Sequence, residues 1–93
     1  MKTITLNNQK YELIKEYKNG FNQEELTSRY TDYFDDYDYI LGDYAYNKLR
    51  LKGFCDKDNK LFKDINDYSK IDDYISNSCA YDCKYFIIKK IQD

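Results

Sequence analysis

Three cysteines carry the most reactive side chains of this chain. Cys79 and Cys83 are separated by three residues, and Cys55 lies further upstream. Two thiolates at this spacing could bind a soft metal ion with Cys55 as a third ligand, but a closed zinc site needs four ligands. The chain has no His and no fourth Cys. Cys79 and Cys83 are therefore a candidate thiol pair, open to a buried structural role, a thiol switch or metal binding shared by a dimer.

The sequence lacks residues that several other common catalytic mechanisms require. Without His there is no triad or dyad that relies on imidazole, and none of the three glycines lies close enough to another for a phosphate-binding loop. We assign no catalytic residue, metal or cofactor, and we expect a non-enzymatic protein. The alternative is a small hydrolase or thiol-redox protein that uses Asp43 or the pair Cys79 and Cys83.

The acidic stretches do not fit a calcium loop. An EF-hand requires oxygen ligands at positions 1, 3 and 5 and glycine at position 6. A loop that starts at Asp36 has Ile40 at position 5, and one that starts at Asp56 has Lys60 there. We interpret these aspartates as a solvated acidic face.

A short cationic segment is the most suggestive feature. Cations beside aromatic rings on a strand are typical of surfaces that hold single-stranded nucleic acid. The same residues also fit a solvated strand face that pairs with acids such as Glu12 or Glu16, or an ion pair between Arg50 and Asp43. The candidate binding surface consists of Asp43, Tyr44, Tyr46, Lys48, Arg50 and Lys52.

The hydrophobic pattern predicts the elements that position these residues. Alternation predicts a hairpin over 3–6 and 11–17, a second over 37–44 and 48–54, a short strand over 60–63 and a last strand over 84–91. Helical spacing and a cap at Asn22 predict helices over 23–34 and 65–78. Their expected buried stripes are Leu26, Tyr30, Tyr33 and Phe34 in the first and Ile65, Tyr68, Ile71 and Ile75 in the second.

The expected fold is α+β, a mostly antiparallel sheet of about five strands with two helices in the order β-β-α-β-β-(β)-α-β. The last strand is apolar on both faces, as a central strand would be. Gly42 and Gly53 lie inside predicted strands, where glycine indicates a bulge or the close approach of another backbone.

Length and composition indicate one domain over residues 1–93, with 12 Tyr and 5 Phe to build much of the core. No segment resembles a signal peptide or a membrane span, so we expect a cytoplasmic protein without a membrane partner. A net charge of −2 argues against DNA binding. We expect a protein partner, with RNA as the alternative.

The segment from Tyr37 to Tyr44, followed by Leu49 to Phe54, resembles the signature of the YutD-like family of small bacterial proteins. Gly20-Phe21-Asn22 with Arg29-Tyr30 resembles the first helix of that family. Cys79 and Cys83 before Tyr85-Phe86 resemble its C-terminal cysteine pair and strand. The resemblance runs from about residue 11 to residue 90.

One position departs from the family pattern, since Tyr44-Ala45 stands where the family has Trp-Gly. The family occurs mainly in low-GC Gram-positive bacteria and their wall-less relatives. The resemblance implies an α+β fold and a cytoplasmic bacterial setting, and it carries no catalytic residues to transfer. From the cationic segment and the many aromatic residues, we expect a binding or regulatory module that acts through the hairpin at 43–52 on a protein or an RNA-containing assembly.

Overall fold

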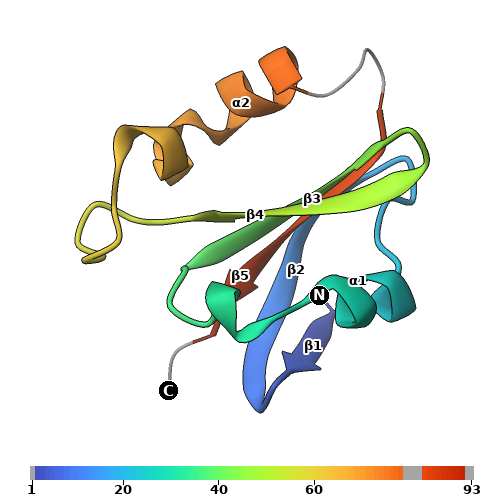
Figure 1. Cartoon of the computed structure of the whole chain (residues 1–93), viewed down its shortest axis with the longest axis horizontal. Coiled ribbons are helices and arrows are strands. Elements are labelled where there is room, and N and C mark those ends of the chain that lie inside the picture. Colours follow the sequence, from blue (N-terminus) through green and yellow to red (C-terminus); the bar gives the residue numbers. More distant parts are fainter. Residues whose placement is uncertain (1, 79–82, 92–93) are drawn as a thin grey trace.

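The structure is a computed structural model that describes residues 2–78 and 83–91. Within these residues, five strands form one antiparallel sheet in the order β1-β2-β5-β3-β4 (Figure 1). The strands are β1 (Thr3–Leu6), β2 (Gln9–Tyr17), β3 (Tyr39–Ala45), β4 (Lys48–Phe54) and β5 (Tyr85–Lys90). The helices are α1 (Gln23–Arg29) and α2 (Ile71–Ser78), with single 3-10 turns η1 (Asp32–Phe34), η2 (Asp64–Asn66) and η3 (Tyr68–Lys70). The predicted α+β fold class is confirmed.

Strand β5 lies between the two hairpins, as its sequence predicted. It pairs with β2 on one side and with β3 on the other. Phe86 and Ile88 join the core under α1, whereas Tyr85 and Ile87 join the core under α2. A strand that is buried on both faces needs apolar side chains at every position, which explains the continuous run Tyr85–Ile88.

Helix α1 ends earlier than its spacing predicted. The Asn22 side chain accepts a hydrogen bond from the Glu25 N–H and starts the helix as expected. Tyr30, however, is extended (ψ 136°), and its hydroxyl bonds to the hydroxyl of Tyr11 and to Asp35. This contact takes the chain out of the helix, so the predicted burial of Tyr33 is wrong and its side chain is 66% exposed.

The second predicted helix begins only at Ile71. The Cys55 N–H donates to the Asn66 carbonyl, and the Tyr68 N–H donates to the Cys55 carbonyl. The backbone groups of Asn66 and Tyr68 therefore bond to Cys55, just after β4, and not within an α-helix. Ile65 was predicted to be buried and is 74% exposed instead. The predicted strand at 60–63 is also absent, since these residues form a turn and a loop ahead of η2.

Both hairpins close with turns of two residues. Asn7 and Asn8 join β1 to β2 with φ of 52° and 65°, and Tyr46 and Asn47 join β3 to β4 with φ of 53° and 63°. Positive φ at both positions is typical of type I′ turns, which match the twist of the strands. Asn adopts this region readily, but a bulky Tyr does so rarely.

An aromatic ring leaves no room for a side chain at Gly42. Gly42 pairs with Phe86 across the sheet, and a Cβ atom at Gly42 would lie 2.2 Å from the Cζ atom of that ring. The predicted close approach is thus made by a side chain and not by a backbone. Gly53 is similar, because a Cβ there would lie 2.4 Å from the Tyr37 ring. Neither glycine tolerates a side chain without movement of its neighbour.

We expect Gly42→Ala to lower the free energy of unfolding by about 1–3 kcal/mol, since the added methyl overpacks the centre of the sheet. Thermal denaturation measures the loss. The double variant Gly42→Ala with Phe86→Leu should be destabilised by less than the sum of the two single variants, because the smaller side chain leaves room for the methyl. Additive losses would contradict this contact.

Candidate functional site

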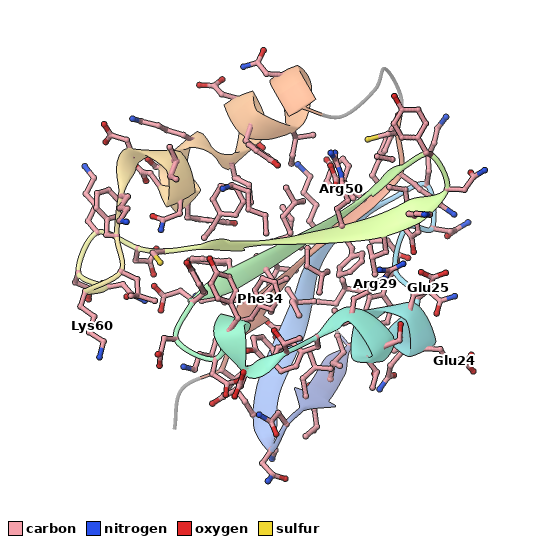
Figure 2. All side chains as sticks on the ribbon, viewed as in Figure 1. Glu24, Glu25, Arg29, Phe34, Arg50 and Lys60 are labelled. Atoms are coloured by element: carbon pink, nitrogen blue, oxygen red, sulfur yellow. The ribbon has the colours of Figure 1, made fainter. Side chains whose placement is uncertain are left out.

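Asp43 and Arg50 face each other across the β3–β4 hairpin. Arg50 is labelled in Figure 2. The Arg50 guanidinium donates from Nε to Asp43 Oδ1 at 3.1 Å and from Nη2 to Oδ2 at 2.7 Å. The Asp43 side chain is 5% exposed and that of Arg50 is 47% exposed. These hydrogen bonds and the charge of Asp43 raise the pKa of Arg50. The pairing is the structural alternative that the sequence allowed, and it holds the guanidinium in a fixed orientation.

The three cations of β4 are held differently. Lys52 is half-buried, and its Nζ lies 5.3 Å from the ring centres of both Phe54 and Tyr74. Lys48 is exposed at the start of the strand. Tyr74 belongs to α2, so this helix partly covers Lys52, whereas Lys48 lies at the rim of the sheet. Along the predicted surface, the lysine side chains are therefore more exposed at Lys48 than at Lys52.

The two tyrosines of the predicted surface lie apart from the Asp43–Arg50 pair. Tyr44 packs on the α1 side of the sheet, where the Nζ atom of Lys84 lies 4.3 Å from its ring centre. Burial raises the pKa of Tyr44. Tyr46 lies at the tip of the hairpin and is 99% exposed. The surface predicted from sequence thus wraps around both faces and the tip of one hairpin.

Sequence reasoning missed residues that β5 and β2 bring to the same end of the sheet. Tyr17 stacks on Tyr85 with ring centres 5.5 Å apart, and Lys18 lies 6.0 Å from the Tyr17 ring. In register, Tyr17 pairs with Tyr85, and Tyr85 pairs with Asp43. We call the residues at this end of the sheet the hairpin-end surface, which comprises Tyr17, Lys18, Tyr44, Tyr46, Lys48 and Lys84. Only the central place of β5 brings these segments together.

Cys55 and Cys83 lie apart and in different chemical states. Cys55 is a free, buried thiol after the end of β4, and burial raises its pKa. Cys83 is disulfide-bonded, whereas the sequence-based interpretation of Cys79 and Cys83 was a pair of thiols. Cys79 lies outside the described residues. Cys55 and Cys83 flank opposite ends of the sheet, because β4 ends where β5 also ends. Within the described residues, no group of three or more His, Cys, Asp or Glu side chains could hold a metal ion.

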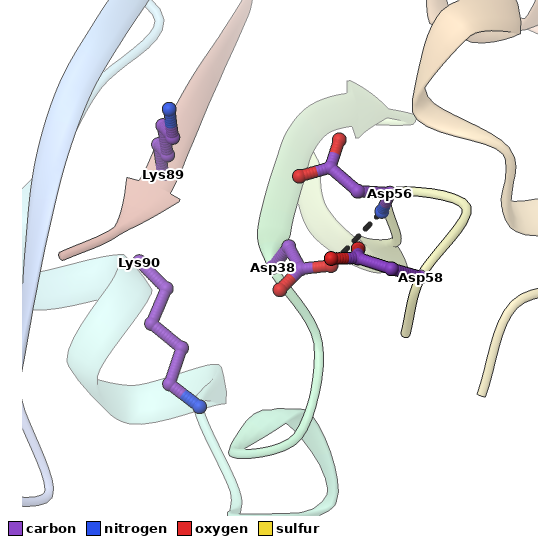
Figure 3. Close-up of a pocket in the computed structure, with 5 residues that line it drawn as sticks. All are labelled: Asp38, Asp56, Asp58, Lys89 and Lys90. Atoms are coloured by element: carbon purple, nitrogen blue, oxygen red, sulfur yellow. Dashed lines mark hydrogen bonds between the residues drawn. The ribbon is translucent and has the colours of Figure 1, made fainter. Parts of the chain in front are cut away.

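The acidic residues near the start of β3 line a cavity of about 340 Å³ (Figure 3). Asp38 Oδ2 accepts hydrogen bonds from the Asp56 N–H at 2.9 Å and from Asn59 Nδ2 at 3.1 Å. Lys89 and Lys90 line the other side of the cavity, and Lys90 Nζ donates to the Asp35 carbonyl at 2.6 Å. These contacts tie the loop after β4 to the start of β3.

None of the helices in the described part of the chain is long and apolar enough to cross a membrane.

A family model described as "Putative antitoxin YutD-like" matches residues 5–89, nearly the whole chain. The chain belongs to the YutD-like family. The family resemblance drawn from the sequence is thereby confirmed. A relative of this YutD-like chain from Bacillus subtilis (strain 168), named "Putative antitoxin YutD", is 42% identical over 89 residues, which are 96% of this chain and 98% of the relative.

The fold agrees with that of a solved YutD structure. The solution NMR structure of protein yutD from B. subtilis superposes with a TM-score of 0.83 at 40% identity. The match covers all of this chain and 84% of the solved one.

We expect Arg50→Met to lower the free energy of unfolding by about 1–3 kcal/mol, because it leaves the buried Asp43 carboxylate without its guanidinium partner. In an Asp43→Asn background the same substitution should cost less, since no charge is then left buried. Chemical denaturation of the four proteins gives the coupling. Lys48→Met is the matched control on the same strand face, with an expected change within about 0.5 kcal/mol. Equal losses in both backgrounds would contradict the pair.

Tyr39 gives a pH-dependent prediction. Burial, the charge of Asp56 and a hydrogen bond to that carboxylate raise the pKa of Tyr39 to about 12. Because the raised pKa favours the neutral phenol in the folded state, its contribution to stability is present below about pH 10 and is lost as the pH rises toward 12. NMR titration of the Tyr39 ring should show the raised pKa. Asp56→Asn should lower it, and an unchanged value would contradict the assigned cause.

Proposed function

We propose that this YutD-like chain is a non-enzymatic antitoxin that binds a partner protein through its β3–β4 hairpin and the adjoining hairpin-end surface. The matching family and the Bacillus subtilis relative both carry the word antitoxin in their names. An antitoxin that is a folded protein can neutralise a toxin by binding to it. The contact residues in this proposal are Asp43, Tyr44, Tyr46, Lys48, Arg50 and Lys52 together with Tyr17, Lys18 and Lys84.

Tyr46 is the observation that carries the proposal. Its side chain is 99% exposed, so the ring gains no burial from the fold. Its backbone has φ of 53°, a region that costs a residue other than Gly, Asn or Asp about 1–2 kcal/mol. The equivalent turn between β1 and β2 uses Asn7 at the corresponding position. A tyrosine that weakens its own turn and contacts water fits a role in binding, where Tyr is a frequent hot-spot residue.

The electrostatics favour a protein over RNA as the partner. Asp43 offsets the charge of Arg50, and Lys52 lies against two rings, so the strip is less basic in space than in sequence. The net charge of the whole chain is −2. A phosphate backbone favours a clearly basic surface, whereas a protein interface gains most from desolvated aromatic and Arg side chains.

A hydrolase centred on Asp43 has less support. Its side chain is buried and both of its oxygens accept hydrogen bonds from Arg50, a geometry that leaves it poorly placed to reach a substrate as a general base. The thiol-redox alternative would use Cys79 and Cys83. Of these two residues, Cys83 is disulfide-bonded and Cys79 lies outside the described residues.

We expect Tyr46→Asn to abolish partner capture while it stabilises the fold by about 0.5–1 kcal/mol, since Asn adopts positive φ more readily than Tyr. The test is affinity capture from lysate of a related bacterium, with mass spectrometry as the readout. Ile65→Asn is the matched control, because it removes a side chain that is 74% exposed on a different part of the surface. It should retain the partner.

Nuclease treatment separates the two classes of partner. A captured protein that survives nuclease, is retained by Ile65→Asn and is reduced at least tenfold by Tyr46→Asn supports the proposal. Loss of all capture after nuclease treatment would assign the surface to RNA. Retention of the protein by Tyr46→Asn would place the interface elsewhere on the molecule.

A further inference from the structure

Strand β4 is an open edge of the sheet. It stands last in the strand order and pairs only with β3 among the described strands (Figure 1). Within the part of the chain that the structure describes, no backbone–backbone hydrogen bond outside the sheet involves residues 48–53. The next outward bonds occur at Cys55, whose N–H and carbonyl pair with Asn66 and Tyr68.

The bonds of Cys55 identify which residues of β4 point outward. In an antiparallel strand, successive residues direct their backbone polar groups alternately to the two neighbours. Because Cys55 bonds away from β3, the alternation also directs the backbone groups of Leu49, Leu51 and Gly53 away from β3. Those of Lys48, Arg50 and Lys52 then point inward, as the turn of two residues requires. The edge thus offers the N–H and carbonyl groups of three residues to an added strand.

The side chains along this edge alternate in chemistry. Lys48, Arg50 and Lys52 project to the α2 face of the sheet, and Leu49 and Leu51 project to the α1 face, where they join the hydrophobic core. An added strand that matches this pattern carries acidic residues on one face and apolar residues on the other.

Antiparallel pairing of β4 with a second copy of itself is unfavourable. Only outward-directed residues can exchange hydrogen bonds across the new pair, so Leu49, Leu51 and Gly53 would pair with one another and the cations would lie opposite cations. In the central register Lys48 would lie opposite Lys52, and Arg50 opposite its own copy. Like charges opposite one another destabilise a sheet. The edge therefore disfavours homodimerisation and favours an acidic strand from another protein.

We propose that the partner protein adds an extended segment of alternating acidic and apolar residues to β4, as a sixth strand of the sheet. This inference rests on the proposed function and specifies the chemistry of the partner. The acidic side chains lie opposite the cations of β4, with Asp43 fixing the orientation of Arg50. The apolar side chains extend the core beside Leu49 and Leu51. Tyr46 contacts the same partner at the end of the added strand.

A synthetic strand tests this directly. The probe is an acetylated peptide of sequence Thr-Glu-Val-Glu-Val-Glu-Thr, and the matched control has Lys in place of each Glu. NMR titration of the full chain should give saturable shifts centred on residues 48–53, with slower hydrogen exchange of the Leu49 and Leu51 amides. The Lys peptide should bind at least tenfold more weakly. Equal binding of both peptides, or no response of the edge amides, would overturn the inference.

Two variants locate the contact. Leu51→Pro removes an outward N–H and leaves the inward bonds to β3 in place, and Leu51→Ala is its control because it loses the same packing but keeps the N–H. The Pro variant should bind the Glu peptide at least tenfold more weakly than the Ala variant, and equal binding would refute the added strand. If Leu51→Pro does not fold, Lys48→Glu decides: it should weaken the Glu peptide and strengthen the Lys peptide, and an unchanged preference would count against the proposal.

The outcomes separate this inference from the proposed function. Tyr46-dependent capture of a protein, with no response of the edge amides to the Glu peptide, refutes the added strand and leaves the proposed function in place. Docking of the Glu peptide on β4, with capture that does not depend on Tyr46, supports the strand and refutes the role of the hairpin tip.

Discussion

The structure depends on the insertion of β5 between two hairpins that have no other strand in common. Each hairpin alone would leave the outer backbone groups of both its strands unpaired, and β5 pairs with one strand of each hairpin at once, β2 on one side and β3 on the other. Its side chains also supply both cores, Phe86 and Ile88 on the α1 side and Tyr85 and Ile87 on the α2 side. The contact of the Phe86 ring with Gly42 shows how closely β3 must approach this strand.

The position of β5 also forms the candidate surface. The β3–β4 hairpin alone provides Tyr44, Tyr46 and Lys48. The insertion of β5 adds Lys84 beside Tyr44 and brings the end of β2, with Tyr17, to the same end of the sheet. The end of β2, the start of β5 and the β3–β4 hairpin are far apart in the sequence. They share one surface because β5 pairs with both β2 and β3.

Local chemistry was sufficient to predict the five strands of the sheet and the start of α1, although it also predicted a strand over 60–63 that does not form. Turn residues at Asn7-Asn8, alternation along β4 and the Asn22 cap all act within a few residues. The Asp43–Arg50 pair was likewise one of the alternatives open from the sequence, since the hairpin register places the two residues opposite each other. The helix boundaries were not predictable in this way. Tyr30 leaves α1 to bond with distant Tyr11, and residues 66–68 bond with Cys55, so tertiary contacts outweigh helical spacing at both sites.

The most direct test of the central claim, that the β3–β4 hairpin is the binding surface, is hydrogen–deuterium exchange of the chain alone and in complex with its captured partner. Binding through this hairpin should protect residues 44–53, most strongly along β4, whose outward amides have no strand partner among the described residues of the isolated chain. Protection confined to α1 or to residues 64–78, with β4 exchanging at the same rate in both states, would contradict it.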